Sequence, residues 1–354
     1  RRFDRASGLG PDFNAAFCTG CHERPVPGGS AGLYRNFFLS GTVTEDGAFV
    51  EGEAAGVIRR NRVPVEGEED LQGFFPAFPE ISGEEISSRA DPDDADGDGI
   101  SGRINIDVGG FVARFGRKSQ VASIEGFIRG PLNNHLGITS DPLTDEQRAN
   151  LPVDSSLAAI GTARSGAKPT VALQAAAPDG PLTDRDDVPD PELSGDDLFD
   201  LVSFVMLMAA PEAEAPTDQT ERGRTTFGEI GCTDCHVARI NGPRGALPVY
   251  SDLLIHDMGP GLADGLIQGE ASGSEFRTQL WGVAAVGPYL HDGRATTLEE
   301  AVLVHGGEGE VSRNAFAALS GSERADIVEF MISLGGREQF SAGLLPPDAA
   351  IPDV

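Results

Sequence analysis

The stretch Cys232-Thr233-Asp234-Cys235-His236 decides how this chain folds, and Cys18-Thr19-Gly20-Cys21-His22 repeats its pattern near the start. Together the two stretches contain all four cysteines. The pattern C-x-x-C-H is the attachment signature of c-type haem. It suits that role because positions i, i+3 and i+4 lie on one face of a helix, so two thiols can bond the porphyrin edge while the imidazole binds iron. The sequence therefore predicts two covalently attached haem c groups, with His22 and His236 as proximal iron ligands.

Other uses of paired cysteines compete with haem. A zinc site of four thiolates needs no histidine after each pair. A thioredoxin-like dithiol belongs to a βαβ context, which the sequence does not indicate, and a pair of disulfides is the third alternative. The motif occurs twice with no cysteine left over, which favours haem. Because such attachment belongs outside the cytoplasm, we expect a processed chain in the periplasm or another extracytoplasmic compartment.

A second internal repeat indicates how the chain is organised. Residues 194–205 and 320–331 share Ser, Gly, Asp, Val and Phe at the same offsets, and each opens with a serine and early acidic residues before apolar positions at helical spacing. Each cysteine motif is thus followed, much later, by a matching amphipathic helix. We predict a mainly α chain, with two cytochrome-c-like domains in tandem, long loops and a few short β-hairpins. The predicted boundaries are 1–212, with insertions near 40–65 (a hairpin) and 165–192, then 213–340, then an extended tail at 341–354.

Composition narrows the function classes. The chain has 354 residues, with 56 acidic against 27 basic side chains and a net charge of −29. A protein that binds a phosphate backbone needs a basic footprint, so nucleic acid is not an expected partner. No apolar run reaches the roughly 18 residues of a transmembrane helix. The acidic surface is either a solvated shell or an attraction for a redox partner protein such as a small cationic electron carrier.

An acidic loop indicates a calcium site. Asp94, Asp96 and Asp98 fit the D-x-D-x-D-G opening of a calcium-binding loop, with glycine at the sixth position. The twelfth position is Asn105 rather than the usual bidentate glutamate, so the loop is not a complete EF-hand. Calcium and a plain acidic turn both remain open.

Three stretches resemble a known family. Residues 287–302 (GPYLHDGRATTLEEAV) are similar to the second-haem domain of bacterial dihaem cytochrome c peroxidases and MauG-type enzymes. Residues 251–262 and 96–103 resemble more narrowly the dihaem oxidoreductase family, whose members are often labelled thiol oxidoreductases or peroxidases. The resemblance covers both haem motifs and most of the chain outside 40–65 and 165–192. It implies an oxidoreductase with two haems.

For the second haem, the resemblance implies a distal iron ligand at His305, which stands where peroxidases carry Met and MauG-type proteins carry Tyr. With His236 on the other side, the iron would be saturated, and the haem would be an electron relay. The alternatives are that His305 is a loop histidine and that Met258 is the ligand. Three further residues are expected to contact cofactor or close loops beside it: His291, Arg294 and Trp281.

For the first haem, the resemblance places the distal side at residues 123–137, where Glu125 and Pro131 match the peroxidase pattern. The catalytic glutamate of that family falls on Gly137 and its glutamine on Phe127. His135, Glu125 and Arg129 are therefore the candidate catalytic residues. His135 has three interpretations of equal weight: iron ligand, free base or loop histidine.

These features support two main functions. The first is a peroxidase-like oxidoreductase, in which the first haem reacts with peroxide and the second relays electrons. The second is a non-catalytic dihaem electron carrier or a subunit of a redox complex, which the absent family glutamate and glutamine favour. Oxygenase-like chemistry is a weaker third possibility.

Overall fold

The computed structural model describes residues 81–153, 180–184, 188–206, 213–242, 245–285 and 287–335, together with the backbone of four short strands between 38 and 58. The first cysteine motif, most of the 165–192 insertion and the 341–354 tail lie outside these described residues. Within them the chain is mostly helical, with short two-stranded antiparallel sheets, which agrees with the mainly α prediction.

Four strands near the start form two antiparallel pairs. Strand β1 (Phe38–Leu39) pairs with β4 (Val57–Ile58), and β2 (Gly41–Val43) pairs with β3 (Phe49–Glu51). The inner pair sets Gly41 opposite Glu51 and Val43 opposite Phe49. The antiparallel pairing predicted for residues 40–65 is therefore present.

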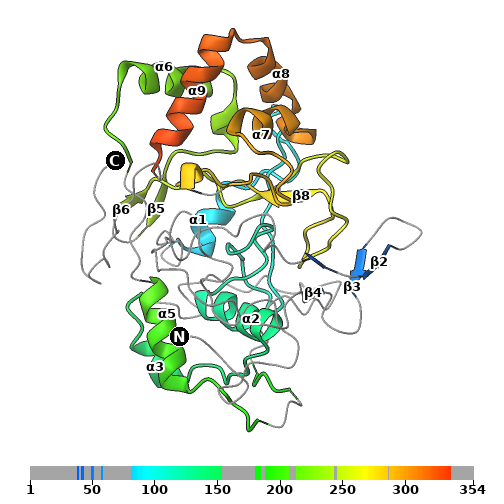
Figure 1. Ribbon diagram of the computed structural model, residues 1–354, viewed down its shortest axis with the longest axis vertical. Helices are drawn as coiled ribbons and strands as arrows, with labels where there is room; N and C mark the ends of the chain where they lie inside the picture. The colour runs from blue at the N-terminus through cyan, green and yellow to red at the C-terminus, as the bar shows by residue number, and fades with distance from the viewer. Residues whose placement is uncertain are drawn as a thin grey trace, which may run out of the picture.

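One end of the molecule carries α2 (Ile124–Leu136), α3 (Asp145–Ala149) and α5 (Gly195–Met206), as Figure 1 shows. The short α1 (Gly83–Ser87) lies nearer the middle. Helix α5 is the predicted helix at 194–205, and the Ser194 hydroxyl accepts a hydrogen bond from the Asp197 amide as an N-cap should. The α5 side chains Leu198, Val202 and Met206 are buried at spacings of four residues. This periodicity explains why the segment is helical.

The other end gathers α6 (Asp218–Glu229), α7 (Leu298–Val304), α8 (Glu310–Ala318) and α9 (Gly321–Ser333) (Figure 1). Helix α9 is the predicted helix at 320–331, and Ser320 begins it with a capping box completed by Glu323. Its buried residues Ile327, Phe330 and Met331 pack on α6, where Phe330 meets Phe227 edge to face with ring centroids 5.4 Å apart. The helix that follows the second cysteine motif thus closes over the helix that precedes it.

Between the two ends in Figure 1 lie the pairs β5 (Ile240–Gly242) with β6 (Gly245–Leu247) and β7 (Ile255–Asp257) with β8 (Glu275–Arg277). The short helix η6 (Val283–Ala285) contacts α9. The larger apolar cluster joins residues from 81–206 with Ile240, Leu247 and Leu254. The smaller cluster fills the α6–α9 end, from Phe227 to Leu334. One core therefore contains residues from both sides of the predicted boundary at 212, and the boundary itself stays a prediction.

Candidate haem-binding site

The second cysteine motif forms a tight helical turn directly after α6. Gly231 has φ of 83°, a left-handed conformation that favours glycine, and it leads into the 3₁₀ helix η5 (Cys232–Asp234). The His236 amide then donates to the Cys232 carbonyl at 3.0 Å. One turn therefore presents two thiols and an imidazole together, as the sequence pattern predicts.

The two thiols of this turn are not suited to dithiol exchange. Both Cys232 and Cys235 are half-buried and free of disulfide. Burial raises the pKa of Cys232 to about 12, with Asp234 adding to the rise, and burial also raises the pKa of Cys235. The thiolate is the reactive species, so protonated thiols argue against the redox-dithiol alternative.

The His236 imidazole is held in the form that binds iron. Its Nδ1 lies 3.2 Å from the Tyr250 carbonyl oxygen. A carbonyl can only accept a hydrogen bond, so the proton is on Nδ1 and the Nε2 lone pair is left for a ligand. Burial, followed by the nearby His305, lowers the pKa of His236 to about 4. The ring is therefore neutral under ordinary conditions.

His305 is prepared in the same way. It caps the C-terminus of α7, and its Nδ1 donates to the Ala301 carbonyl oxygen at 2.8 Å. Burial lowers its pKa below the usual range as well. The chain thus has two neutral imidazoles with matching tautomers, and His305 is one of the groups that lower the pKa of His236. This donor set fits the two axial positions of a haem iron, with Cys232 and Cys235 beside them.

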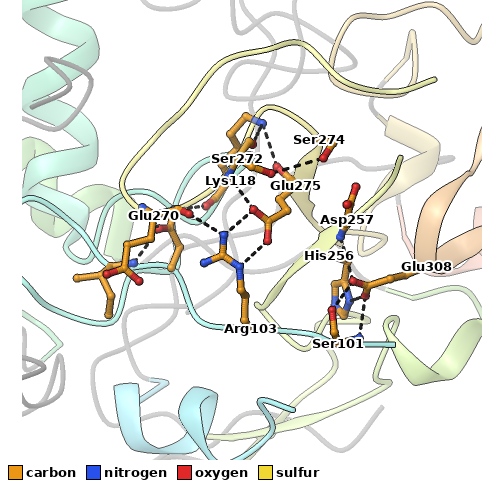
Figure 2. Close-up of polar contacts among 12 residues, drawn as sticks. Ser101, Arg103, Lys118, His256, Asp257, Glu270, Ser272, Ser274, Glu275 and Glu308 are labelled. Carbon is orange, nitrogen blue, oxygen red and sulfur yellow. Dashed lines mark hydrogen bonds and ion pairs between the residues drawn. The ribbon is translucent and has the colours of Figure 1, made fainter. Parts of the chain in front are cut away.

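A charged cluster that includes His256 and Glu308, both labelled in Figure 2, contacts the same turn at Cys235. The buried His256 ring has Nε2 2.8 Å from Asp252 Oδ2 and Nδ1 2.8 Å from Glu308 Oε2, with Cys235 Sγ at 3.6 Å from that Nδ1. Burial alone would lower the pKa of His256, but the hydrogen bonds to Asp252, Cys235 and Glu308 outweigh it and hold the pKa well above its usual range. His256 is therefore an imidazolium clamped between two carboxylates.

Two cations tie residues 103–118 to the β7–β8 region (Figure 2). The Arg103 guanidinium forms a two-pronged ion pair with Glu275, with Nε 2.5 Å from Oε1, and it donates to the Glu270 carbonyl at 2.6 Å. Lys118 is buried. Its ammonium donates to the carbonyls of Ser272 and Glu275 and pairs with Asp264 at 3.2 Å. These ion pairs and hydrogen bonds hold together segments that are far apart in the sequence.

Three other residues are expected near the second haem, and the structure gives the surroundings of each. His291 stacks on Phe276 with ring centroids 4.2 Å apart, and the Lys118 ammonium lies 3.8 Å from the centre of the same Phe276 ring. Arg294 is exposed and pairs with Asp292 while donating to the Gly261 carbonyl. Trp281 packs against the larger core cluster. Their contacts with cofactor stay predictions.

The distal candidates for the first haem share helix α2. Glu125 is buried, accepts from the Leu143 amide at 2.8 Å and receives two bonds from Arg148. Arg129 is also buried and donates to the carbonyls of Ser140 and Gly180, both at 2.8 Å. Pro131 lies inside the helix, and His135 is half-buried in its last turn, before the left-handed Gly137. Since Cys18, Cys21 and His22 lie outside the described residues, the catalytic roles stay predictions.

The structure brings the three predicted calcium ligands together. Carboxylate oxygens of Asp94, Asp96 and Asp98 all lie within 4.8 Å of one another. Gly99, at the sixth position, has φ of 87°, which gives the sharp turn that the D-x-D-x-D-G pattern predicts. Calcium binding itself stays a prediction.

Calcium at this loop is expected to raise thermal stability. At a free concentration 100 times the dissociation constant, a ligand that binds only the folded chain adds about 2.7 kcal/mol, or a few degrees in Tm. Differential scanning fluorimetry of EDTA-treated protein should show this rise with millimolar calcium, and Asp96→Asn should abolish it. Identical Tm values with calcium, magnesium and EDTA would contradict the assignment.

Sequence reasoning missed the partners of His256 and the two interior cations. His256 lies in the family-like stretch 251–262, but nothing in the local pattern pairs it with Glu308, 52 positions away. Lys118 is one of the few lysines in the sequence, and this rarity was a signal that sequence reasoning could have used. The structure shows that its side chain is buried. The remaining contacts follow from long-range packing.

The turn of two thiols that ends at His236, together with His305 on the turn after α7, has the donor side chains of a haem-binding redox protein. More particularly, the profile of the family described as "Di-haem oxidoreductase, putative peroxidase" matches residues 60–334, and the chain belongs to that family.

No curated protein matches the chain. Among solved structures, hydrazine synthase from Kuenenia stuttgartiensis, pressurised with xenon, matches at 21% identity and a TM-score of 0.28. The match covers 39% of this chain and 55% of that one, so the chain spans about half the length of that relative. Among the described helices, none has both the length and the apolar character needed to cross a bilayer.

Proposed function

We propose that this chain is a c-type dihaem oxidoreductase with peroxidase-like activity that works outside the cytoplasm. Cys232 and Cys235 would attach one haem, with His236 and His305 as its axial ligands, and the motif at 18–22 would attach the other. The observation that supports this most directly is the pair of neutral imidazoles whose Nδ1 atoms are both bonded to backbone carbonyls. This arrangement leaves the Nε2 lone pair of each ring available to bind a metal.

The two sites would have different tasks. Bound haem supplies one-electron redox chemistry. Two imidazoles would fill both axial positions of the second site, so this site suits electron relay. Reaction with peroxide would then belong to the first site, where His135 is our candidate for holding or moving the peroxide proton.

The partners follow from charge and chemistry. The net charge of −29 favours a cationic electron carrier as the redox partner, since opposite surface charges speed encounter. Peroxide is the proposed substrate because the family includes peroxidases by its description. Attachment through C-x-x-C-H implies assembly outside the cytoplasm.

A specific observation favours the second candidate, a non-catalytic electron carrier. Glu125 is bonded to Arg148 and the Leu143 amide, and Arg129 is bonded to two backbone carbonyls. Side chains engaged in this way are poorly placed to exchange protons with a substrate. If His135 is also an iron ligand, both haems are saturated.

Electron paramagnetic resonance of the resting ferric protein separates the two functions. For an oxidoreductase we expect one high-spin and one low-spin haem, with peroxide rapidly oxidising the reduced protein. His135→Ala should slow that reaction by roughly a hundredfold or more if His135 moves the proton. Arg224→Ala, an exposed change on α6 at a side chain that pairs with Glu221 in the neighbouring turn, serves as the control. Two low-spin haems that are inert to peroxide would instead establish the carrier.

A further inference from the structure

The loop that carries His305 is unusually well anchored. After α7 ends at Val304, the chain passes through His305 and Gly306 into the 3₁₀ helix η7 (Gly307–Gly309). Within the turn formed by residues 305–309, Glu308 is the one acidic residue, and it lies three residues beyond His305. Its side chain is only 11% exposed. A buried carboxylate requires compensating donors, so its partners are informative.

Four donors converge on the Glu308 carboxylate (Figure 2). Oε1 accepts from the Ser101 hydroxyl at 2.7 Å and from the Asp257 amide at 3.2 Å. Oε2 accepts from the Ser101 amide at 3.1 Å and from His256 Nδ1 at 2.8 Å. The carboxylate thus joins three segments: the end of the acidic loop, strand β7 and the turn after α7. Hydrogen bonds to a charged group are stronger than those between neutral groups, so this junction is rigid.

The same turn lies directly against the backbone of β7. A Cβ on Gly307, which has φ of 54°, would overlap the Asp257 carbonyl oxygen, and a Cβ on Gly306 would lie 2.9 Å from the Met258 carbonyl. A Cβ on Gly309 would lie 3.3 Å from the His305 Cβ. Glycines therefore let the turn approach β7 and fold back beside His305, while Glu308 supplies the polar anchor.

His256 is held from its other side. Its Nε2 faces Asp252, and Asp252 Oδ1 accepts from the Leu254 amide at 3.0 Å. The His256 side chain is 1% exposed and the Asp252 side chain is 4% exposed, so the pair cannot shift without losing buried bonds. The anchor of Glu308 is therefore fixed to the segment that also meets Cys235.

We propose that Glu308 is a positioning residue for the second haem, holding the His305 turn on His256 and Ser101 so that the His305 imidazole stays on the iron. The proposal rests on His305 being the axial ligand put forward above. Because Ser101 ends the acidic loop, the ligation of this haem is also coupled to the placement of a much earlier segment, at a sequence separation of 207. Glu308 touches neither substrate nor iron in this role.

The test compares Glu308→Gln with Glu310→Gln in the full haem-loaded protein. Glu310 is exposed in the next turn, pairs with Arg313 and is the matched control. In Glu308→Gln the side chain keeps its size but loses the charge that His256 faces. We expect Glu308→Gln to lower, by roughly tenfold or more, the ratio of protein with His305 on the iron to protein with His305 off the iron. The change would be seen as loss of low-spin signal from the second haem. Added imidazole should restore that signal. If Glu308 affected the haem only through its charge, imidazole would not be needed to keep the iron low-spin. Glu310→Gln should match the wild type.

His305→Ala separates the two hypotheses. If His305→Ala removes the low-spin signal and Glu308→Gln leaves both this signal and the haem potential unchanged, the positioning role is wrong while the ligand assignment stands. If His305→Ala changes nothing, the ligand assignment fails and the positioning role fails with it. Should Glu308→Gln not mature, Ser101→Ala replaces it, with a smaller loss in the same direction expected. A wild-type spectrum in that variant would then overturn the proposal.

Discussion

Replacing Cys232 and Cys235 together by alanine is expected to remove one of two haems from the mature chain. The thioether bonds form from the two thiols of this turn, and without them only the axial bonds proposed for His236 and His305 would hold this haem, without covalent attachment to the chain. The pyridine haemochrome assay should fall to half of the wild-type haem per chain, and intact mass should drop by one haem beyond the change in sulfur content. This is the largest chemical effect that any substitution here should produce.

The matching experiment uses the first motif. Cys18→Ala with Cys21→Ala should cause the same loss of one haem and should leave the low-spin signal attributed to His236 and His305. Wild-type haem content in either double variant would show that the affected motif does not attach haem. Equal losses in both would support the assignment of one haem to each motif.

The second large effect is expected at Gly223, where α6 and α9 cross. A Cβ built on Gly223 would overlap the Asp326 carbonyl oxygen and lie 2.9 Å from the Phe330 Cβ. Neither is the flexible end of a side chain, so the helices must separate. We expect Gly223→Ala to lower the free energy of unfolding by about 3 kcal/mol, at the upper end for overpacked cores. Guanidinium titration of the haem-loaded protein, followed at the second-haem spectrum, measures the shift.

Gly228 provides the control on the same helix. A Cβ there would meet only Thr233 Cγ2, at an ordinary 3.9 Å. Gly228→Ala should therefore be neutral or stabilising by up to about 1 kcal/mol, because alanine favours helix over glycine. If both variants unfold at the same guanidinium concentration, the close approach of α6 and α9 is not what Gly223 provides.

Much of the second site could be predicted from local sequence. The C-x-x-C-H spacing indicates the thiols and the proximal imidazole, since these positions share one helical face. The repeated Ser-Gly-acidic openings mark α5 and α9, since their caps and apolar periodicity are properties of short segments. The prediction of His305 as an iron ligand came from the resemblance to a family motif, and the structure adds that its tautomer suits a ligand.

Long-range contacts could not be predicted in the same way. Local spacing carries no information about which carboxylate will meet His256, because Glu308 and Ser101 come together beside it only when the turn after α7 packs on β7. The same holds for the pairing of Lys118 with Asp264 and for the meeting of Gly223 with Asp326. Charges and close approaches of this kind are decided by the packing of distant segments.

By itself, the sequence determined which of these segments would be helical and that the chain would be strongly acidic, and it predicts where haem would be attached. These properties depend on residues a few positions apart or on composition. The tertiary structure alone decided that burial keeps the His236 and His305 rings neutral and that Glu308 bonds the turn after α7 to His256. The physical reason is that tautomer, charge state and ligand placement depend on burial and on hydrogen-bond partners, which exist only after distant parts of the chain come together.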